Sequence, residues 1–266
     1  MTLTARAALT KIFATALLLV GGNLFACERL LGRIALMDAA ETGNTKRLER
    51  LVSRRVDVNV VDQCGKTALM FAAAAGRPDA TAILLKAGAN PNLHEKGYGR
   101  TALHFAVSAG SAPIANALIA AGAEVDARDN YGDSPLIVAS ALGKDDAVKV
   151  LVAAKADVNA RRTGPINRNA LHQAAYTGNA QTVSALIAAG ADVNEPAEAG
   201  WTPLMIAMLY GKPDVVEELL AAGANVNARS NSGWTALKEA EFRKYDGVAK
   251  RLRAAGAIEF VDGERK

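Results

Sequence analysis

The stretch TALHFAVSAGSAPIANALIAAGAEVDARDNYGD, residues 101–133, is one copy of a pattern that runs along most of the chain. A Thr, Ser or Asn followed two residues later by Leu stands at positions 67, 101, 134, 169, 202 and 235, at spacings of 34, 33, 35, 33 and 33 residues. Counting back one period from Thr67 reaches Ile34. A fixed period of this length predicts seven stacked structural units.

The residues that open each unit are types that cap helices. A hydroxyl or amide side chain at this place accepts a hydrogen bond from a free backbone amide of the first helical turn. Pro135 and Pro203 come directly afterwards, where a missing amide hydrogen costs nothing. The predicted N-caps are Thr67, Thr101, Ser134, Asn169, Thr202 and Thr235.

Small residues recur inside each unit. Five residues after the cap position stand Ala39, Ala72, Ala106, Ala139, Ala174, Ala207 and Ala240, which predicts first helices packed so closely that a methyl group is the largest side chain admitted. Six glycines end these helices: Gly43, Gly76, Gly110, Gly143, Gly178 and Gly211. Glycine at this point predicts a left-handed turn between two helices.

A second helix follows in each unit. Its buried ridge is predicted to contain adjacent apolar pairs, namely Leu51 and Val52, Leu84 and Leu85, Leu118 and Ile119, Leu151 and Val152, Leu186 and Ile187, and Leu219 and Leu220. Ala80 is expected on the outer surface of this layer. The carboxylate pairs Asp145-Asp146 and Glu217-Glu218 are expected there too, as solvated side chains, as is Lys149.

The motifs Thr-Ala-Leu-His at 101–104, Thr-Pro-Leu-Met at 202–205 and Ala-Ala-Gly-Ala-Asn-Val-Asn at 221–227 closely resemble the ankyrin repeat. The resemblance covers residues 30–258. It implies an all-α solenoid of about seven helix-turn-helix units joined by β-hairpin loops. The expected ankyrin-repeat domain spans residues 27–258, with units anchored near 34, 67, 101, 134, 169, 202 and 235, and a polar tail follows at 259–266.

Several residues depart from the family pattern. Ile34 stands where a cap belongs, Arg55 and Lys155 replace glycine at the end of second helices, and Lys244 replaces the glycine between two helices. We expect the first and last units to be polar ends, and the turn at Lys155 to be irregular. The long spacings place one extra residue in 95–99 and two in 161–168, both in loops, where added residues are tolerated.

Residues 1–26 have the pattern of a signal peptide. Arg6 and Lys11 are the only charges, and the apolar run from Ile12 to Val20 is too short to span a membrane. The junction of Ala26 and Cys27 resembles a lipoprotein cleavage site, although the bulky Phe25 fits that pattern poorly. Lipidation of Cys27, a disulfide between Cys27 and Cys64, and separate thiols all stay open. We therefore expect an exported protein, in the periplasm or secreted, with a membrane attachment only through a lipid on Cys27.

Composition and motifs do not favour nucleic-acid binding or catalysis. The formal net charge is +4, and removal of Arg6 and Lys11 leaves 29 basic against 27 acidic residues, with no basic cluster. No nucleophile, phosphate-loop or dinucleotide motif is present, so we expect no enzyme activity and no cofactor. His104 and His172 occupy the last place of the Thr-x-Leu-His motif. There the family resemblance implies structural hydrogen bonds rather than metal binding. His94 stands alone in a predicted loop.

Aromatic residues gather where the ankyrin resemblance implies contact with partners. Tyr and Trp are favoured at binding hot spots because they bury a large area and have few rotatable bonds. For Trp201 and Trp234, partner contact and coverage of the hairpin stem are equally supported alternatives. The predicted protein-binding residues are Tyr98, Arg100, Tyr131, Asp133, Arg168, Tyr176, Trp201, Tyr210, Trp234 and Phe242.

The sequence thus predicts a monomeric scaffold that binds an unidentified protein through its hairpin tips and first helices, outside the cytoplasm. Two other functions stay open. One is a secreted effector that acts on host proteins, and the other is an accessory or inhibitory subunit of an envelope enzyme. The recognition residues of such scaffolds are not a code, so the sequence does not name the partner.

Overall fold

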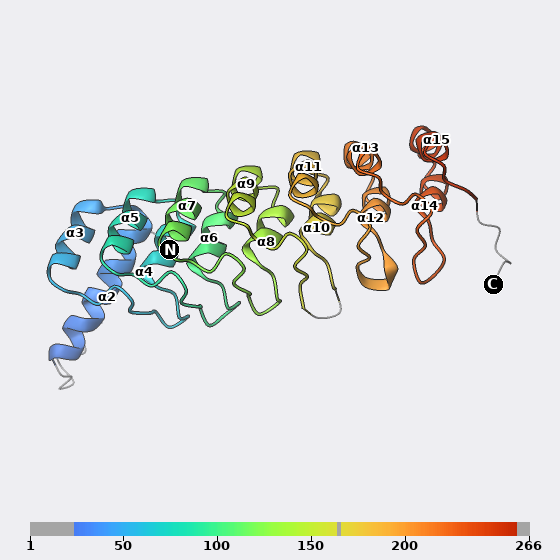
Figure 1. Ribbon diagram of the computed structural model, residues 1–266. Coiled ribbons are helices and arrows are strands. Elements are labelled where there is room, and N and C mark those ends of the chain that lie inside the picture. The colour runs from blue at the N-terminus through green and yellow to red at the C-terminus, as the bar shows by residue number, and fades with distance from the viewer. Residues whose placement is uncertain (1–23, 164–165, 260–266) are drawn as a thin grey trace. The chain divides into compact units, whose positions relative to one another are not determined.

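The computed structural model describes residues 24–163 and 166–259, and within them the chain is helical (Figure 1). It forms 14 α-helices and one short 3₁₀-helix, and these residues contain no β-strand. The predicted all-α fold of repeated helix pairs is confirmed. The chain divides into two compact units, residues 1–124 and 125–266, called unit 1 and unit 2 below.

In each unit, short first helices alternate with second helices along the chain. Unit 1 contains the first helices α2 (Leu24–Thr42), α4 (Ala68–Ala74) and α6 (Ala102–Ser108), and the second helices α3 (Thr45–Ser53), α5 (Pro78–Lys86) and α7 (Ala112–Ala120). Unit 2 contains the first helices α8 (Pro135–Ala141), α10 (Ala170–Thr177), α12 (Pro203–Leu209) and α14 (Ala236–Phe242), and the second helices α9 (Asp145–Ala153), α11 (Ala180–Ala188), α13 (Pro213–Ala221) and α15 (Asp246–Ala254). Within each unit, first helices pack on first helices and second helices on second helices (Figure 1).

The predicted caps and turns of the first helices are confirmed. All six cap residues have extended backbone angles, and the side chains of Thr67, Ser134, Asn169, Thr202 and Thr235 accept a hydrogen bond from the third residue that follows. The seven recurrent alanines have no exposed surface. The six turn glycines adopt positive φ angles between 61° and 84°. The core is therefore built from alanines on first helices and larger aliphatic side chains around them.

The second-helix predictions need two corrections. In α5, α7, α9, α11 and α13 the first residue of each apolar pair is buried and the second is half-buried, whereas in α3 both Leu51 and Val52 are half-buried and Leu48 is buried instead. Ala80 was expected on the surface, which is wrong: it has 1% of its surface exposed. Its position on α5 faces inward, and Ala82 is the exposed alanine of this helix.

The chain ends differ from the inner repeats. Helix α2 begins at Leu24, ten residues before the expected cap position, so Ile34 lies inside a helix and needs no capping side chain.

Residues 1–23 and 260–266 lie outside the described residues, as does the side chain of Cys27, so the predicted signal segment and lipidation site are not tested. Cys64 is an exposed free thiol. None of the helices in the described part of the chain combines the length and the apolar character needed to cross a bilayer.

The connecting loops are closed by single backbone pairs rather than by long hairpins. The amide of Asp129 donates to the carbonyl of Asp133 at 3.0 Å, and that of Arg162 donates to Arg168 at 3.0 Å. Isolated antiparallel bridges join Val61 to Thr67 and Arg161 to Asn169. The hairpins expected from the family resemblance are thus tight turns with at most one bridge.

Lys155 does not make its turn irregular. The amide of Ala156 donates to the carbonyl of Leu151 at 3.0 Å, as the amide of Ala191 donates to Leu186 one repeat later. Arg55, Lys155 and Lys244 adopt φ angles of 56°, 62° and 59°, in the region that glycine prefers. The turn geometry is therefore kept at the expense of backbone strain.

Candidate protein-binding surface

Two of the ten predicted binding residues belong to unit 1. Tyr98 lies at a loop tip with 55% of its surface exposed, and the guanidinium carbon of Arg100 is 5.3 Å from the centre of its ring. Glu95 shapes this loop from inside: its carboxylate is buried and accepts hydrogen bonds from the amides of Gly97 and Tyr98. A Cβ atom on Gly97 would be 2.8 Å from that carboxylate, so a larger residue here would have to displace the Glu95 carboxylate.

The electrostatic balance at Glu95 favours its charged form. Burial alone would raise the pKa of the Glu95 carboxyl. The amides of Gly97, Tyr98 and Arg100, together with the charge of Lys66, outweigh burial and lower the pKa below its usual range. The Tyr98 tip is therefore built around a buried carboxylate that is ionised at neutral pH.

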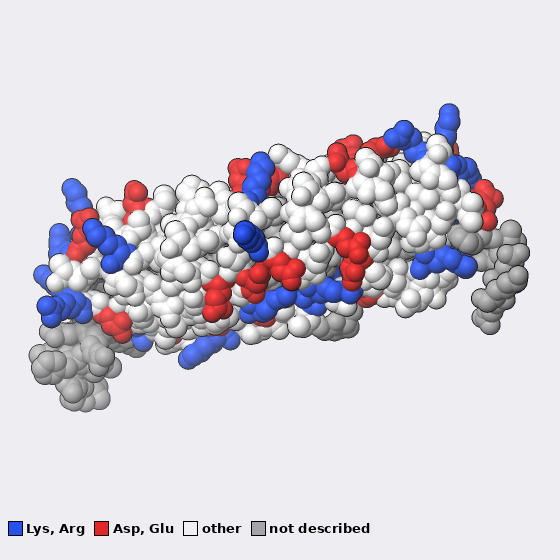
Figure 2. Space-filling view, viewed as in Figure 1, with Lys and Arg blue, Asp and Glu red and all other residues white. Residues whose placement is uncertain are grey.

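The other eight predicted residues belong to unit 2, where arginines link neighbouring loops. Arg162 pairs with Asp133 at 3.0 Å, and its guanidinium carbon lies 5.7 Å from the ring centre of Tyr131. Arg168 pairs with Glu198 at 2.6 Å, with its guanidinium carbon 5.8 Å from the ring centre of Tyr176. Figure 2 shows acidic and basic side chains lying next to one another over these loops.

These pairings place the tyrosines in defined positions at the surface. Tyr176 and Tyr210 meet edge to face, with ring centres 4.5 Å apart, although they come from consecutive first helices. About half of Tyr131 is exposed, and slightly less of Tyr176 and Tyr210. Edge-to-face pairs add about 0.5 to 1.5 kcal/mol beyond area burial. The two rings therefore form one continuous aromatic surface across two repeats.

The last repeat contributes a separate aromatic pair. Trp234 lies edge to face with Phe242, with ring centres 5.8 Å apart, and the Lys238 ammonium is 5.6 Å from the centre of a Trp234 ring. Trp234 is half-buried, while Phe242 has 73% of its surface exposed. Trp201 is half-buried as well, and its carbonyl closes its own loop by accepting from the amide of Ala197 at 2.8 Å.

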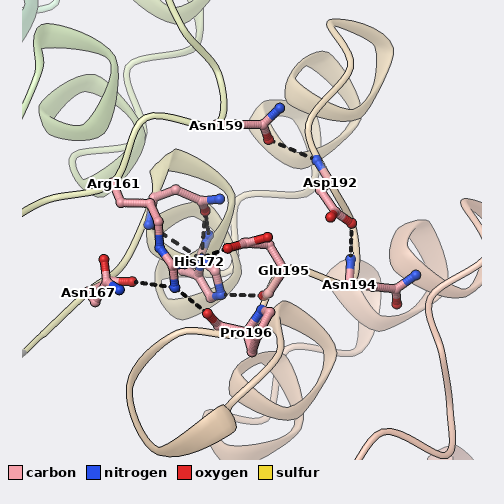
Figure 3. A network of polar contacts seen from close by, with 9 residues as sticks. Asn159, Arg161, Asn167, His172, Asp192, Asn194, Glu195 and Pro196 are labelled. Carbon is pink, nitrogen blue, oxygen red and sulfur yellow. Dashed lines mark hydrogen bonds and ion pairs between the residues drawn. The ribbon is translucent and has the colours of Figure 1, made fainter.

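A polar network beneath the surface holds the loops of unit 2 together (Figure 3). His172 has no exposed surface, and its Nε2 lies 2.9 Å from the carbonyl oxygen of Glu195 in the next loop. Arg161 pairs with the Glu195 carboxylate at 2.5 Å and donates to the carbonyls of Asn167 and Pro196. The structural role expected for His172 from the family resemblance is confirmed, since it ties a first helix to the following loop.

His172 titrates well below the usual range of histidine. Burial lowers its pKa to about 4, and the charges of Arg161 and Arg168 act in the same direction. The hydrogen bond to Glu195 and the charge of Glu198 oppose this shift without cancelling it. His172 is therefore neutral at physiological pH. Its role is to form hydrogen bonds that connect a first helix to the next loop, and it contributes no positive charge to the surface.

The two other histidines also make local contacts. His104 is buried in α6, with Nδ1 2.9 Å from Oγ1 of its capping residue Thr101. His94, expected to stand alone, has its Nδ1 2.7 Å from the carbonyl oxygen of Gly99 and so helps to close the Tyr98 loop. Across the described residues, no three His, Cys, Asp or Glu side chains are grouped as metal ligands.

Asparagines form a second set of links between repeats. Asn159 donates from Nδ2 to the carbonyl of Gly190 at 3.2 Å and accepts from the amide of Asp192 at 3.0 Å (Figure 3). Asn92 makes the same pair of bonds in unit 1, to Gly122 and Glu124. The sequence analysis did not predict this ladder, although its signal was present as an Asn or Asp at the recurrent positions 59, 92, 126, 159, 194 and 227.

The carboxylate pairs on the second helices are less isolated than expected. Asp145 accepts from Asn179 at 2.8 Å and from the buried hydroxyl of Thr182 at 2.6 Å. Glu218 accepts from Ser184, and Glu217 pairs with Arg251. Apart from Asp146, which faces Lys149 at 3.4 Å, these carboxylates connect neighbouring second helices.

The comparisons with known proteins agree with this architecture. A family model for ankyrin repeats matches residues 5–95, 87–162 and 171–260. The chain belongs to the ankyrin-repeat family. Members of this family bind protein partners, and their scaffolds are typically binding modules without catalytic activity.

Solved structures give the same result over most of the chain. The human ASB11 ankyrin repeat domain is similar with a TM-score of 0.75 and 26% identity, over 85% of this chain and 99% of that one. The ankyrin repeat domain of Bcl-3 is similar with a TM-score of 0.73 and 26% identity, over 82% and 97%.

Curated relatives match only a short segment. The mitochondrial disaggregase of Bos taurus is 46% identical over 59 residues, which is 22% of this chain and 9% of that protein. Neurogenic locus notch homolog protein 1 of Xenopus tropicalis is 42% identical over 62 residues, 23% of this chain and 2% of that protein. The aligned segment therefore spans under a tenth of the full length of either relative.

Proposed function

We propose that this chain is a protein-binding scaffold without catalytic activity that acts outside the cytoplasm. The observation that carries the binding proposal is the surface of unit 2. Tyr131, Tyr176 and Tyr210 are exposed at loop tips and first-helix ends, yet each is fixed by a neighbouring guanidinium or ring. Restrained aromatic side chains lose little entropy when they bind, which favours their use as anchors.

The arginines serve this surface indirectly. Arg168 was predicted to contact the partner, but 18% of its side chain is exposed and its guanidinium is paired with Glu198. The side chain of Asp133 is 13% exposed and paired with Arg162. In this proposal the tyrosines touch the partner, and Arg162 and Arg168 hold the tyrosine rings in position.

Cross-linking tests the binding proposal directly. A photoreactive phenylalanine analogue is placed at Tyr210 in one variant and at Lys149, on the second helix α9, in another. Irradiation in the cells that produce the chain should join the Tyr210 variant to a discrete protein and leave the Lys149 variant unjoined. Adducts formed at Lys149 alone would move the binding surface to the second helices, and no adduct from either variant would refute the scaffold function.

The location outside the cytoplasm rests on residues 1–26. The charged start, the apolar run and the Ala26–Cys27 junction support removal of this segment and a mature chain that begins at Cys27. Mass spectrometry of protein purified from the cell envelope should find Cys27 as the first residue. An intact Met1 would refute export by this route, while an unmodified Cys27 would refute only the lipid anchor.

A further inference from the structure

The ends of the first helices in unit 2 carry large exposed apolar side chains that the repeat architecture does not require. They stand at the last residue, the last but one, or the residue just after each helix: Leu142, Tyr176, Tyr210 and Phe242, with between 41% and 73% of their surface exposed. In unit 1 the last residue of each first helix and the residue after it are Thr42 and Gly43, Ala74 and Ala75, and Ser108 and Ala109. Small residues therefore satisfy the fold at these places.

Lysines accompany this apolar row. Lys144 and Lys212 are the N-cap residues of α9 and α13, and Lys244 lies in the turn before α15. The side chain of Lys212 lies across Gly178, where an added Cβ atom would come within 2.5 Å of Cδ. Its ammonium group is thereby held against the turn that directly follows the end of α10, two residues after Tyr176 in the sequence.

Helix stability does not explain the lysines at these caps. Neither Lys144 nor Lys212 makes a side-chain capping bond, whereas Asn179 at the same position of α11 accepts one from Thr182. The N-terminus of a helix carries partial positive charge, so a cation is disfavoured there. Replacing a good cap with a residue that cannot cap destabilises a helix.

The lysines are not neutralised by ion pairs within unit 2. Over residues 125–163 and 166–259, the salt bridges engage none of Lys144, Lys212 and Lys244. The two carboxylates that follow Lys144 are already engaged, Asp145 by Asn179 and Thr182, and Asp146 by Lys149. The surface thus combines exposed apolar groups with positive charge available to a ligand.

We infer that Leu142, Tyr176, Tyr210 and Phe242, together with Lys144 and Lys212, form a docking row for a partner segment in which large apolar residues alternate with Asp or Glu. This inference rests on the proposed binding function and specifies the chemistry of the partner. The apolar groups of the segment pack on the Tyr176–Tyr210 pair, where aromatic anchors contribute most binding energy. Its carboxylates face the lysines, which add orientation and a faster association.

The docking row can be tested by selecting, from a library of random displayed peptides, those that bind the full-length chain. Enriched peptides are measured against three double variants: Tyr176→Ala with Tyr210→Ala, Lys144→Glu with Lys212→Glu, and the control Asp146→Ala with Lys149→Ala. We expect enriched peptides to combine Leu, Phe or Trp with Asp or Glu. The first two variants should weaken binding by at least about tenfold, and the control should bind as the unaltered chain does.

Two results would overturn the inference. Basic or uncharged peptides would show that the lysines do not select acidic partners, and acidic peptides that bind all three variants equally would place recognition elsewhere. Circular dichroism and melting of each variant verify folding, since all six altered side chains are exposed or half-buried. Either failure leaves the scaffold function standing as long as the Tyr210 cross-linker still captures a protein.

Discussion

Lys155 adopts the left-handed backbone conformation at the turn position that Gly190 occupies one repeat later, with φ angles of 62° and 91°. Three backbone hydrogen bonds are common to the two turns, so the lysine carries the strain while the turn keeps its main bonds. Asp126 adds a second defect at this point. It accepts from the amide of Asp157 but, unlike Asn159, has no amide group to donate across the repeat boundary. The turn at Lys155 and the link at Asp126 therefore stabilise the chain less than Gly190 and Asn159 do one repeat later.

Replacing Lys155 by glycine should stabilise the chain. A side chain in the left-handed region costs roughly 1 to 2 kcal/mol, partly offset by the greater freedom of glycine in the unfolded chain, which leaves a net gain of about 1 kcal/mol. Urea denaturation of Lys155→Gly should show a higher midpoint. As a matched control, Gly190→Lys should lower it. A Lys155→Gly midpoint at or below that of the unaltered chain would contradict the assigned strain.

The closely packed first helices should not accept larger side chains. Ala72 in α4 is fully buried, while Ala82 in α5 of the same repeat is exposed. Overpacking a core costs about 1 to 3 kcal/mol. The unfolding free energy of Ala72→Leu should therefore fall by that amount, and Ala82→Leu should stay close to the unaltered chain. Equal denaturation midpoints for the two variants would show that the helix register is wrong.

The buried His172 should make stability depend on pH. Its pKa is about 4 in the folded chain and near the ordinary value of 6.5 in the unfolded chain, so between these values the unfolded state binds more protons. The stabilisation is fully present above pH 6.5 and is lost as the pH falls toward 4, by about 3 kcal/mol in total. The unfolding free energy of His172→Gln should lack this component. Parallel pH profiles for the two proteins would disprove it.

Asn169 serves His172 less well than a threonine would. Its Oδ1 accepts from the amide of His172 and also lies 2.6 Å from Nδ1, while its buried Nδ2 has no partner among the described residues. When Nε2 donates to Glu195, Nδ1 is an acceptor that takes a 3.4 Å bond from the backbone amide of Asn169, so the Asn169 Oδ1 atom 2.6 Å away has no proton to share with it. A hydroxyl can accept and donate at once, and at the equivalent position Oγ1 of Thr101 lies 2.9 Å from Nδ1 of His104. Asn169→Thr should thus raise the unfolding free energy by about 1 kcal/mol, measured by urea denaturation, and a decrease would contradict the assignment.

The sequence predicted the repeat, its caps and its inner alanines because each depends on a fixed period and on local hydrogen bonding. It did not predict the outward or inward direction of residues whose neighbours come from another repeat. The prediction that Ala80 is exposed was wrong for this reason. Contact of Arg168 with the partner stays a prediction, but its pairing with Glu198, 30 residues further on, could not be predicted because it depends on how the loops stack. The tyrosines could be located at loop tips and helix ends from the sequence, but their ring contacts could not.

The tyrosine surface of unit 2 is proposed to bind the partner. The most direct test measures the affinity of the cross-linked partner, once purified, for two double variants. Tyr176→Ala with Tyr210→Ala should lose about 2 kcal/mol or more of binding free energy at an unchanged melting temperature, whereas Asp146→Ala with Lys149→Ala should bind like the unaltered chain. Normal affinity in the tyrosine variant together with lost affinity in the Asp146 and Lys149 variant would contradict the account.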